Sequence, residues 1–430
     1  MEKDKKKIKL ITFAPHPNFG TCLQSYALNY VLRLMGHDVE FIFNCREVPP
    51  VPIRSRIWRG VKGFIKMLMP QSKVKEIQTR RKAERLALEE KGIKADPDIL
   101  KLPNRPLLRL FSLTPIYNRW WKWYKCKNLQ WKKVFKFTYE DGNFRMRRIF
   151  THKQYAEVAA EADMFITGSD QIWNPYCGGF NPMMFVEFGG DTKRIAYSSS
   201  IAQDSFPKIV EGRVKDDLSK FSHIAVRECQ SVDLLNKLLG RTDVKLVVDP
   251  TFLLTRQEWS DFGKRAVLEF DVPERYIFCY LIGSEHIPVY RQMVEEVKEM
   301  TGIKDVISLE CYNRDVNFGG GRLYKDAGPY EWVYLIEHAS YVCMDSFHAT
   351  AFALKFEKDF VHCMKNRARQ TGSQNSRMTD ILSRYGLLYK NYTPDSPNDW
   401  KRSVDYSKVT PLVQADINDS MQFLRYEIEN

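Results

Sequence analysis

Short apolar runs alternate with stretches of helical periodicity along most of the chain. Apolar runs bounded by polar turns predict buried strands at residues 8–14, 39–44, 164–167, 194–200, 223–228, 244–250, 276–283, 305–311, 341–345 and 360–364. Apolar residues recurring at helical spacing predict helices at 21–36, 153–162, 229–239, 288–300, 330–338, 349–356, 377–385 and 413–426. Strands that alternate with helices favour parallel sheets built from βαβ units.

The alternation comes in two runs, which predicts an α/β fold with two doubly wound, Rossmann-like domains. The first domain is expected at 1–250 and the second, with a closing C-terminal helix, at 251–430. Residues 46–150 break the alternation and indicate a helical insertion in the first domain. Ligands of such sheets bind at the carboxyl ends of the strands, so the polar turns there should gather around one interdomain cleft.

Composition excludes two other classes of protein. Hydrophobic residues make up 44% and charged residues 28%, which is ordinary for a globular chain and excludes disorder as the main state. No apolar run approaches the ~18–20 residues of a membrane-spanning helix. The run at 8–13 is too short for a signal peptide, so we expect a cytoplasmic protein.

The charge of the chain is concentrated in the insertion. Residues 51–136 hold 23 Lys and Arg against 6 Asp and Glu, a net of +17, whereas the whole chain carries +13 and the remainder therefore −4. Five of the nine tryptophans also lie there. A solvated helical hairpin or a nucleic-acid patch would have this composition, but an apolar stripe at 57–68 between basic residues favours an anionic membrane surface. The rest of the chain carries no nucleic-acid motif, so no nucleic acid partner is expected.

Two polar loops follow predicted strands of the first domain. Asn18 and Gly20 lie in the first loop, which can present backbone N–H groups to an anion or a sugar or form a plain tight turn. The second loop contains the candidate binding residues Gly168, Ser169, Asp170 and Gln171, and Asp170, Gln171 and Asn174 are its candidate partners for sugar hydroxyls. Trp173 in the same loop is a candidate to stack on a sugar face. The alternative for this loop is a capped structural turn.

Arg227 ends a predicted strand and is followed directly by Glu228. The planar guanidinium of an arginine suits phosphate or carboxylate. A structural ion pair with Glu228 or Asp249 is the other interpretation.

His348 follows Ser346 and Phe347 at the start of a predicted helix in the second domain. The positive potential of a helix N-terminus favours the neutral ring, which can exchange a proton; a helix-capping role is the alternative. Lys365 and Arg377 are candidates to neutralise a phosphate or simply to solvate a loop. No Cys/His cluster has the spacing of a zinc site, and no metal is expected.

The order and spacing of these motifs resemble the polysaccharide pyruvyl transferase family. The resemblance covers about residues 8–45 and 151–390. Its motifs are Asn18-Phe-Gly20, Gly168-Ser-Asp-Gln-Ile-Trp-Asn-Pro175, Ala196-Tyr-Ser-Ser-Ser-Ile-Ala202 with Ser199 and Ser200, Val226-Arg-Glu228, Asp249-Pro-Thr-Phe-Leu253 and Ser346-Phe-His-Ala-Thr-Ala351.

The resemblance implies a fold similar to that of GT-B glycosyltransferases. It implies transfer of the enolpyruvyl unit of phosphoenolpyruvate to two sugar hydroxyls, with a cyclic pyruvate ketal and phosphate as products and with no cofactor. Arg227 and His348 match the arginine and histidine that such enzymes use for phosphoenolpyruvate binding and catalysis. Many relatives have an arginine where this chain has Ser346, so either Lys365, Arg367 or Arg377 would supply the cation here or the substrate would differ. Whether Asp170 or Asp249 acts on the acceptor stays open.

The leading hypothesis is therefore a pyruvyl transferase that acts on a lipid-linked sugar in capsule or exopolysaccharide biosynthesis. It would work as a peripheral protein on the inner face of the cytoplasmic membrane, docked through residues 51–136. One alternative is a nucleotide-sugar glycosyltransferase of the same fold. Another is a non-enzymatic scaffold that binds a membrane or nucleic acid.

Overall fold

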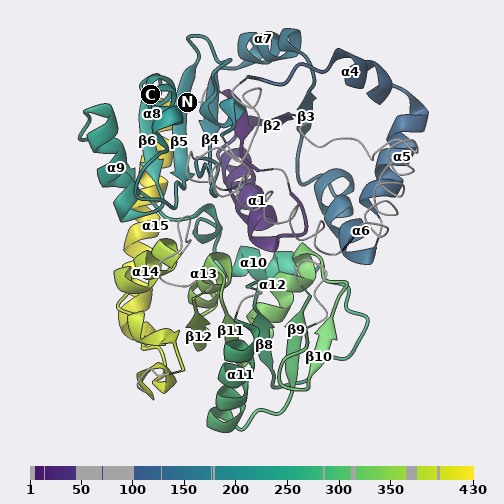
Figure 1. The fold of residues 1–430 in the computed structure, drawn as a ribbon, viewed down its shortest axis with the longest axis vertical. Helices are drawn as coiled ribbons and strands as arrows, with labels where there is room; N and C mark the ends of the chain where they lie inside the picture. Colours follow the sequence, from purple (N-terminus) through teal and green to yellow (C-terminus); the bar gives the residue numbers. More distant parts are fainter. Residues whose placement is uncertain are drawn as a thin grey trace.

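The computed structural model describes residues 5–13, 15–44, 70, 101–126, 128–175, 177, 180–283, 286–310, 316–364, 375–394 and 398–430. Two parallel sheets, one in each half of the chain, form the centres of two domains, one above the other in Figure 1, and helices lie around each sheet. The predicted α/β class with two Rossmann-like domains is confirmed.

The first sheet has seven strands in the order β3-β2-β1-β4-β5-β6-β7. All neighbouring pairs are parallel. The strands are β1 Lys7–Ile11, β2 Asp38–Asn44, β3 Met146–Ile149, β4 Met164–Thr167, β5 Lys193–Ser199, β6 His223–Val226 and β7 Lys245–Leu246. The order reverses between β1 and β4, and the carboxyl ends of these strands form the ligand-binding edge in folds of this kind.

The second sheet has six parallel strands in the order β10-β9-β8-β11-β12-β13. They are β8 Ile277–Tyr280, β9 Val306–Leu309, β10 Arg322–Tyr324, β11 Tyr341–Met344, β12 Phe360–Cys363 and β13 Asn391–Tyr392. The central strands β8 and β11 are buried at every position, which is why they read as continuous apolar runs rather than as alternating ones.

The helices of the described residues connect these strands. They are α1 Phe19–Leu34, α4 Pro106–Ser112, α5 Pro115–Lys125, α6 Leu129–Phe135, α7 His152–Glu161, α8 Lys208–Leu218, α9 Cys229–Leu239, α10 Arg256–Gly263, α11 Ile287–Thr301, α12 Pro329–His338, α13 Phe347–Lys355, α14 Asn375–Arg384 and α15 Tyr406–Glu429. In the part of the chain that the structure describes, none of them is long and apolar enough to span a bilayer.

The two domains share one hydrophobic core. The ring of Phe19, at the first position of α1, lies 6.1 Å from Tyr280 of β8 and 6.4 Å from Trp332 of α12, between ring centroids. All three side chains are buried. Packing of large aromatic rings stabilises such a contact, and here it holds the N-terminus of α1 against the second domain.

The C-terminal helix α15 contacts both domains (Figure 1). Near its start, Tyr406 donates a hydrogen bond to the carbonyl oxygen of Ala353 at 3.2 Å. Near its end, the carbonyl oxygen of Glu427 accepts a hydrogen bond from Lys193 Nζ of β5 at 2.7 Å. The last helix of the chain therefore returns to the first sheet.

The described part of the insertion differs from the sequence prediction in one respect. Residues 46–150 showed no strand in sequence, yet β3 lies inside this range and pairs with β2. The arginines of β3 gave no apolar run in the sequence. Charged side chains are common on edge strands, and here Arg147 forms ion pairs with Glu40 at 3.1 Å and with Glu161 at 2.6 Å. The helical stripe predicted at 57–68 lies outside the described residues.

Candidate active site

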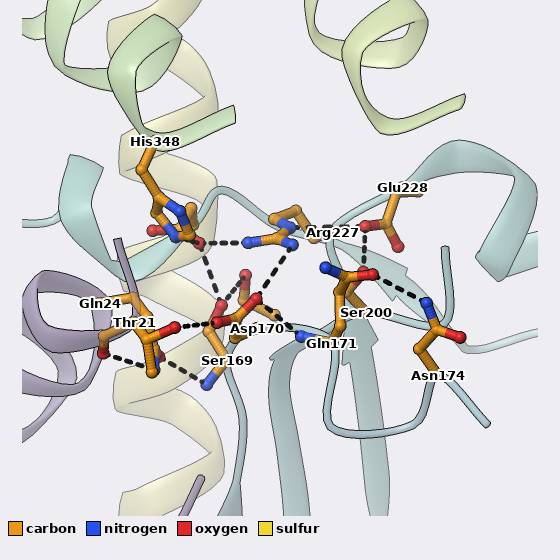
Figure 2. A network of polar contacts seen from close by, with 12 residues as sticks. Thr21, Gln24, Ser169, Asp170, Gln171, Asn174, Ser200, Arg227, Glu228 and His348 are labelled. Atoms are coloured by element: carbon orange, nitrogen blue, oxygen red, sulfur yellow. Dashed lines mark hydrogen bonds and ion pairs between the residues drawn. The ribbon is translucent and has the colours of Figure 1, made fainter. Parts of the chain in front are cut away.

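Two predicted residues from opposite domains meet on one buried carboxylate. Arg227 follows β6 of the first domain, and His348 is the second residue of α13 in the second domain. Arg227 Nη1 donates to Asp249 Oδ2 at 2.6 Å, and His348 Nε2 lies 3.6 Å from the same oxygen. All three residues are buried. The expected approach of a guanidinium and an imidazole across the domain boundary is therefore present in the structure (Figure 2).

Asp249 is held ionised by its surroundings. Its Oδ1 accepts hydrogen bonds from Thr251 N at 3.0 Å and Thr251 Oγ1 at 2.8 Å, and its Oδ2 accepts one from Ser169 Oγ at 3.0 Å. Burial would raise the pKa of this carboxyl, but His348, Arg227 and the Thr251 N–H outweigh burial and lower the pKa well below its usual range. Asp249 thus places a negative charge between the Arg227 guanidinium and the His348 imidazole.

The guanidinium of Arg227 is fixed on several sides. Its centre lies 4.1 Å from the ring centroid of Phe347, a cation–π contact. Its Nε donates to Glu228 Oε1 at 3.4 Å, and its Nη2 lies 3.9 Å from Asp170 Oδ1. Burial would lower the pKa of Arg227, but Asp249, Glu228 and Asp170 raise it. Nη2 has no hydrogen-bond partner among the described residues, so one donor of the fork remains for a ligand.

Asp170 connects the loop after β4 to helix α1. Its Oδ2 accepts a hydrogen bond from Thr21 Oγ1 at 2.9 Å, and its Oδ1 accepts one from Gln171 N at 2.9 Å. Burial opposes ionisation, but the charges of His348, Arg227 and Arg377 lower the pKa of Asp170. Asp170 is therefore a second buried carboxylate beside the same cations.

Gly20 lets the backbone of α1 approach the imidazole. A Cβ at this position would lie 2.1 Å from His348 Nδ1, far inside contact distance. The N-terminal turn of α1 therefore lies directly against His348. Gly20 is required here for close approach, not for an unusual backbone conformation.

Arg377 of α14 adds a further buried cation. With the Gln171 amide turned so that its oxygen faces Arg377, that oxygen accepts hydrogen bonds from Nη1 at 3.3 Å and Nη2 at 3.2 Å. Burial and the nearby charge of Arg227 lower the pKa of Arg377 to about 10, against the opposing effect of Asp170 and Glu228. The guanidinium is still charged at neutral pH, so Arg227 and Arg377 together supply positive potential.

The remaining predicted residues support these groups. Ser200 Oγ donates to Glu228 Oε1 at 2.5 Å, and Ser199 Oγ donates to the carbonyl oxygen of Thr167 at 3.3 Å. A Cβ on Gly168 would lie 2.0 Å from the carbonyl oxygen of Tyr197, so only glycine fits between β4 and β5. These residues position the loop rather than face the cations.

Other predicted residues have different surroundings. Asn18 and Ser346 stand at the N-caps of α1 and α13, and neither side chain caps its helix. Trp173 is 1% exposed and donates its indole N–H to the carbonyl oxygen of Met184, so the predicted sugar stacking by Trp173 is wrong. Lys365 and Arg367 lie outside the described residues.

Sequence reasoning missed three residues of the network. Thr21 bonds Asp170, Thr251 bonds Asp249, and Gln24 Oε1 accepts a hydrogen bond from Ser169 N at 3.2 Å. Thr21 and Gln24 are three apart on α1 and both buried. Polar residues among the buried apolar residues of this helix were the available signal, because buried polar groups need partners.

The cluster combines fixed positive charge with a group that can transfer a proton. Within the described residues, no group of three or more His, Cys, Asp or Glu side chains is arranged to hold a metal ion. A small cavity adjoins the cluster and is lined by Arg227, Asp249 and Phe347 together with Asp380 and Arg384 of α14. The arrangement can bind an anion and move a proton next to it.

Comparisons with known proteins place the chain in a family. It is similar in fold to the Arabidopsis thaliana UGT89C1 complexed with UDP-L-rhamnose (8% identity, TM-score 0.44, 98% of this chain and 95% of that chain). It is also similar to the UDP-GlcNAc 2-epimerase from Methanocaldococcus jannaschii (10% identity, TM-score 0.41, 96% and 99%). No curated protein matches the sequence. The model of one family, described as polysaccharide pyruvyl transferase, matches residues 18–366. Because that match covers most of the 430 residues, the chain belongs to the polysaccharide pyruvyl transferase family.

Proposed function

We propose that this transferase moves the enolpyruvyl unit of phosphoenolpyruvate onto two hydroxyls of one sugar. The products would be a cyclic pyruvate ketal and inorganic phosphate. The observation that carries the proposal is the meeting of Arg227 and His348, from opposite domains, on the Asp249 carboxylate. The expected acceptor is a lipid-linked sugar of capsule or exopolysaccharide biosynthesis.

The charges of the site suit a donor that is anionic at both ends. Phosphoenolpyruvate carries a phosphate and a carboxylate, and preorganised positive charge stabilises both without a metal. Arg227 offers its Nη2 donor, and Arg377 adds a second buried guanidinium. The N-terminal turns of α1 and α13 add the positive ends of two helices.

The reaction needs one proton donor at carbon and a route for two hydroxyl protons. A proton from the His348 imidazolium adds to the methylene carbon, and the oxocarbenium-like centre that forms is attacked by the first sugar hydroxyl, whose proton returns to the His348 imidazole. The bond from that carbon to the phosphate oxygen then breaks, and its electron pair leaves with the phosphate. The second hydroxyl attacks the same carbon and gives its proton to the departing phosphate, which closes the ketal ring and releases inorganic phosphate.

His348 is assigned the proton transfers to the methylene carbon and from the first hydroxyl, and the two aspartates a positioning role. The pKa of Asp249 and that of Asp170 are both lowered, so both carboxylates are ionised at neutral pH and hold a proton weakly. Asp249 orients Arg227 and His348 through its contacts with both. Asp170, which is held by hydrogen bonds from Thr21 Oγ1 and Gln171 N, orients the first acceptor hydroxyl.

The product distinguishes this reaction from its alternatives. The protein is incubated with phosphoenolpyruvate and a glycan acceptor, and the acceptor is analysed by mass spectrometry. A mass gain equal to pyruvate minus water, with one phosphate released per acceptor, supports the proposal. A gain of one hexose from a nucleotide sugar, without any pyruvate product, would establish a glycosyltransferase instead. Absence of both with every acceptor would favour a binding scaffold.

A further inference from the structure

One surface of the insertion exposes its apolar side chains. Helix α4 has no buried residue, although its sequence is rich in leucine. Leu107 is 81% exposed, Leu110 69%, Leu113 72% and Ile116 76%. Exposed apolar patches of this kind mark interaction sites. We call the face formed by these four residues and Trp123 the α4–α5 surface.

The exposure is not a sign of loose packing, because α5 is anchored by its other face. Tyr117 and Trp121 are buried, and the ring of Phe111 of α4 lies 5.1 Å from that of Tyr117. The guanidinium of Arg148, in β3, lies 5.1 Å from the Trp121 ring centroid. The helices are therefore attached to the first sheet through aromatic contacts. Figure 1 places α4 and α5 at the outer edge of the molecule, and the leucines and Ile116 are exposed there.

The charge around the α4–α5 surface is mostly positive. Residues 101–139 contain ten Lys and Arg and no Asp or Glu. Arg119 and Lys122 are exposed on α5 itself, and Lys122 forms an ion pair with Glu140. An apolar face bordered mostly by basic residues is complementary to an anionic lipid surface, in which acyl chains lie beneath negative headgroups.

We propose that the α4–α5 surface docks this protein on an anionic membrane. Leu107, Leu110, Leu113 and Ile116 enter the boundary between headgroups and acyl chains, and the basic side chains contact the phosphates. Single-stranded nucleic acid would need aromatic faces for base stacking, whereas the most exposed residues here are aliphatic. A second copy of the chain would bring two sets of positive charges together. The docking surface does not depend on the reaction proposed above.

Vesicle co-sedimentation of the full-length protein tests the proposal. The vesicles consist of phosphatidylcholine alone or of phosphatidylcholine with phosphatidylglycerol. The wild type should sediment with the anionic vesicles and much less with the neutral ones. The variant L107E/L110E/L113E should lose at least ten-fold in apparent affinity. The variant R109Q/R119Q should lose about five-fold for each charge removed near the surface.

A matched control tests whether the position of the substituted residues matters, and not only the added negative charge. The variant L34E/V267E/L412E also replaces three exposed apolar residues, but none lies on the α4–α5 surface, and it should bind vesicles as the wild type does. Circular dichroism verifies that all variants are folded. Equal binding to neutral and anionic vesicles, retention by L107E/L110E/L113E, or equal loss in the control would overturn the proposal. So would a lipid-free dimer of the wild type that L107E/L110E/L113E converts to a monomer.

Discussion

At the scale of single residues, Gly20 ties the first helix to the imidazole of the second domain. Its missing side chain leaves room for His348, since a Cβ would lie 2.1 Å from the Nδ1 atom. The sequence alone marked Gly20 as a candidate for binding an anion or a sugar. In the structure, the missing side chain of Gly20 determines where the His348 imidazole can lie.

Substituting Gly20 with alanine should therefore displace His348. We expect the activity of G20A to fall by about 10²-fold, which is typical when a reacting group is misplaced by about 1 Å. The measurement is the steady-state rate of phosphate release together with the thermal midpoint. Gly212 in α8 is a matched control, because a Cβ there meets nothing within 4 Å. G212A should keep full activity, and equal loss in both variants would contradict the role given to Gly20.

Asp249 should contribute stability that depends on pH. Replacing it by asparagine leaves the buried Arg227 guanidinium without this carboxylate, and breaking a buried ion pair costs about 3–5 kcal/mol. The folded pKa of Asp249 lies below its unfolded value. Its contribution is therefore fully present above about pH 4, the usual carboxyl pKa, and is lost as pH falls through the lower folded pKa.

Urea unfolding of wild type and D249N between pH 7 and pH 2.5 measures this effect. The difference in unfolding free energy should be largest at neutral pH and should shrink below about pH 4. A difference that stays constant over the whole range would mean that folding does not lower the pKa of Asp249.

Much of the site could be predicted at this scale, because the end of a buried strand is marked in the sequence by the change from an apolar run to a polar turn. Arg227 and His348 each stand where an apolar strand gives way to a helix, and the fold brings such ends together. Thr21, Gln24 and Thr251 were missed because hydroxyl and amide side chains are common in any helix start or turn. Their role depends on which carboxylate lies opposite, which only the tertiary structure determines.

At the scale of elements, the strands and helices that are long enough and buried enough to give a clear apolar pattern were the ones predicted from the sequence. Strand β4 and helix α9 have the bounds predicted from their apolar patterns. Strand β10 and helices α8 and α10 were not predicted, because a strand of three residues and helices with mixed polar faces give weak periodic signals. Missing elements of this kind changed the number of strands but not the fold class.

The end of α13 holds a lysine with unusual titration. Lys355 Nζ donates to the carbonyl oxygen of Phe252 at 2.8 Å, and burial lowers the pKa of Lys355 to about 8. Because the unfolded lysine titrates near pH 10.4, the unfolded chain binds more protons than the folded one between these values. Stability contributed by this site therefore rises with pH over that interval.

Lysine-to-methionine substitution isolates that contribution. The free energy of unfolding of wild type relative to K355M should increase from pH 7.5 to pH 10.5. Guanidinium unfolding at four pH values measures it, and subtraction cancels the titration of other groups. A flat or falling difference would show that Lys355 stays charged in the folded protein.

At the scale of the whole molecule, the insertion connects the two domains. Lys133 of α6 donates to Glu269 Oε1 and Tyr324 OH of the second domain, both at 2.9 Å, and its Nζ lies 3.2 Å from Glu331 Oε1. The sequence predicted a basic insertion but not this contact, because the partners of Lys133 lie more than 130 residues away. Deleting residues 51–136 as one block would remove this contact, so a deletion meant to test membrane docking should end before α6.

Removing the Lys133 amine should weaken this contact between domains. K133M should lose about 1.5–3 kcal/mol, the range for hydrogen bonds to charged groups. Lys136 is the control, because its side chain is 65% exposed and lies 4.0 Å from Asp141; K136M should stay within about 0.5 kcal/mol of the wild type. Equilibrium urea unfolding compares the two, and equal losses would contradict the bridging role.

The most direct test of the central claim is the rate of phosphate release from phosphoenolpyruvate in the presence of a glycan acceptor, compared between wild type and H348A. Phosphate release should require the acceptor, and H348A should release phosphate about 10²–10⁴-fold more slowly than the wild type, the usual effect of losing a general acid or base. A folded H348A that releases phosphate at the wild-type rate would contradict the assignment of the cluster at Arg227, Asp249 and His348 as the active site.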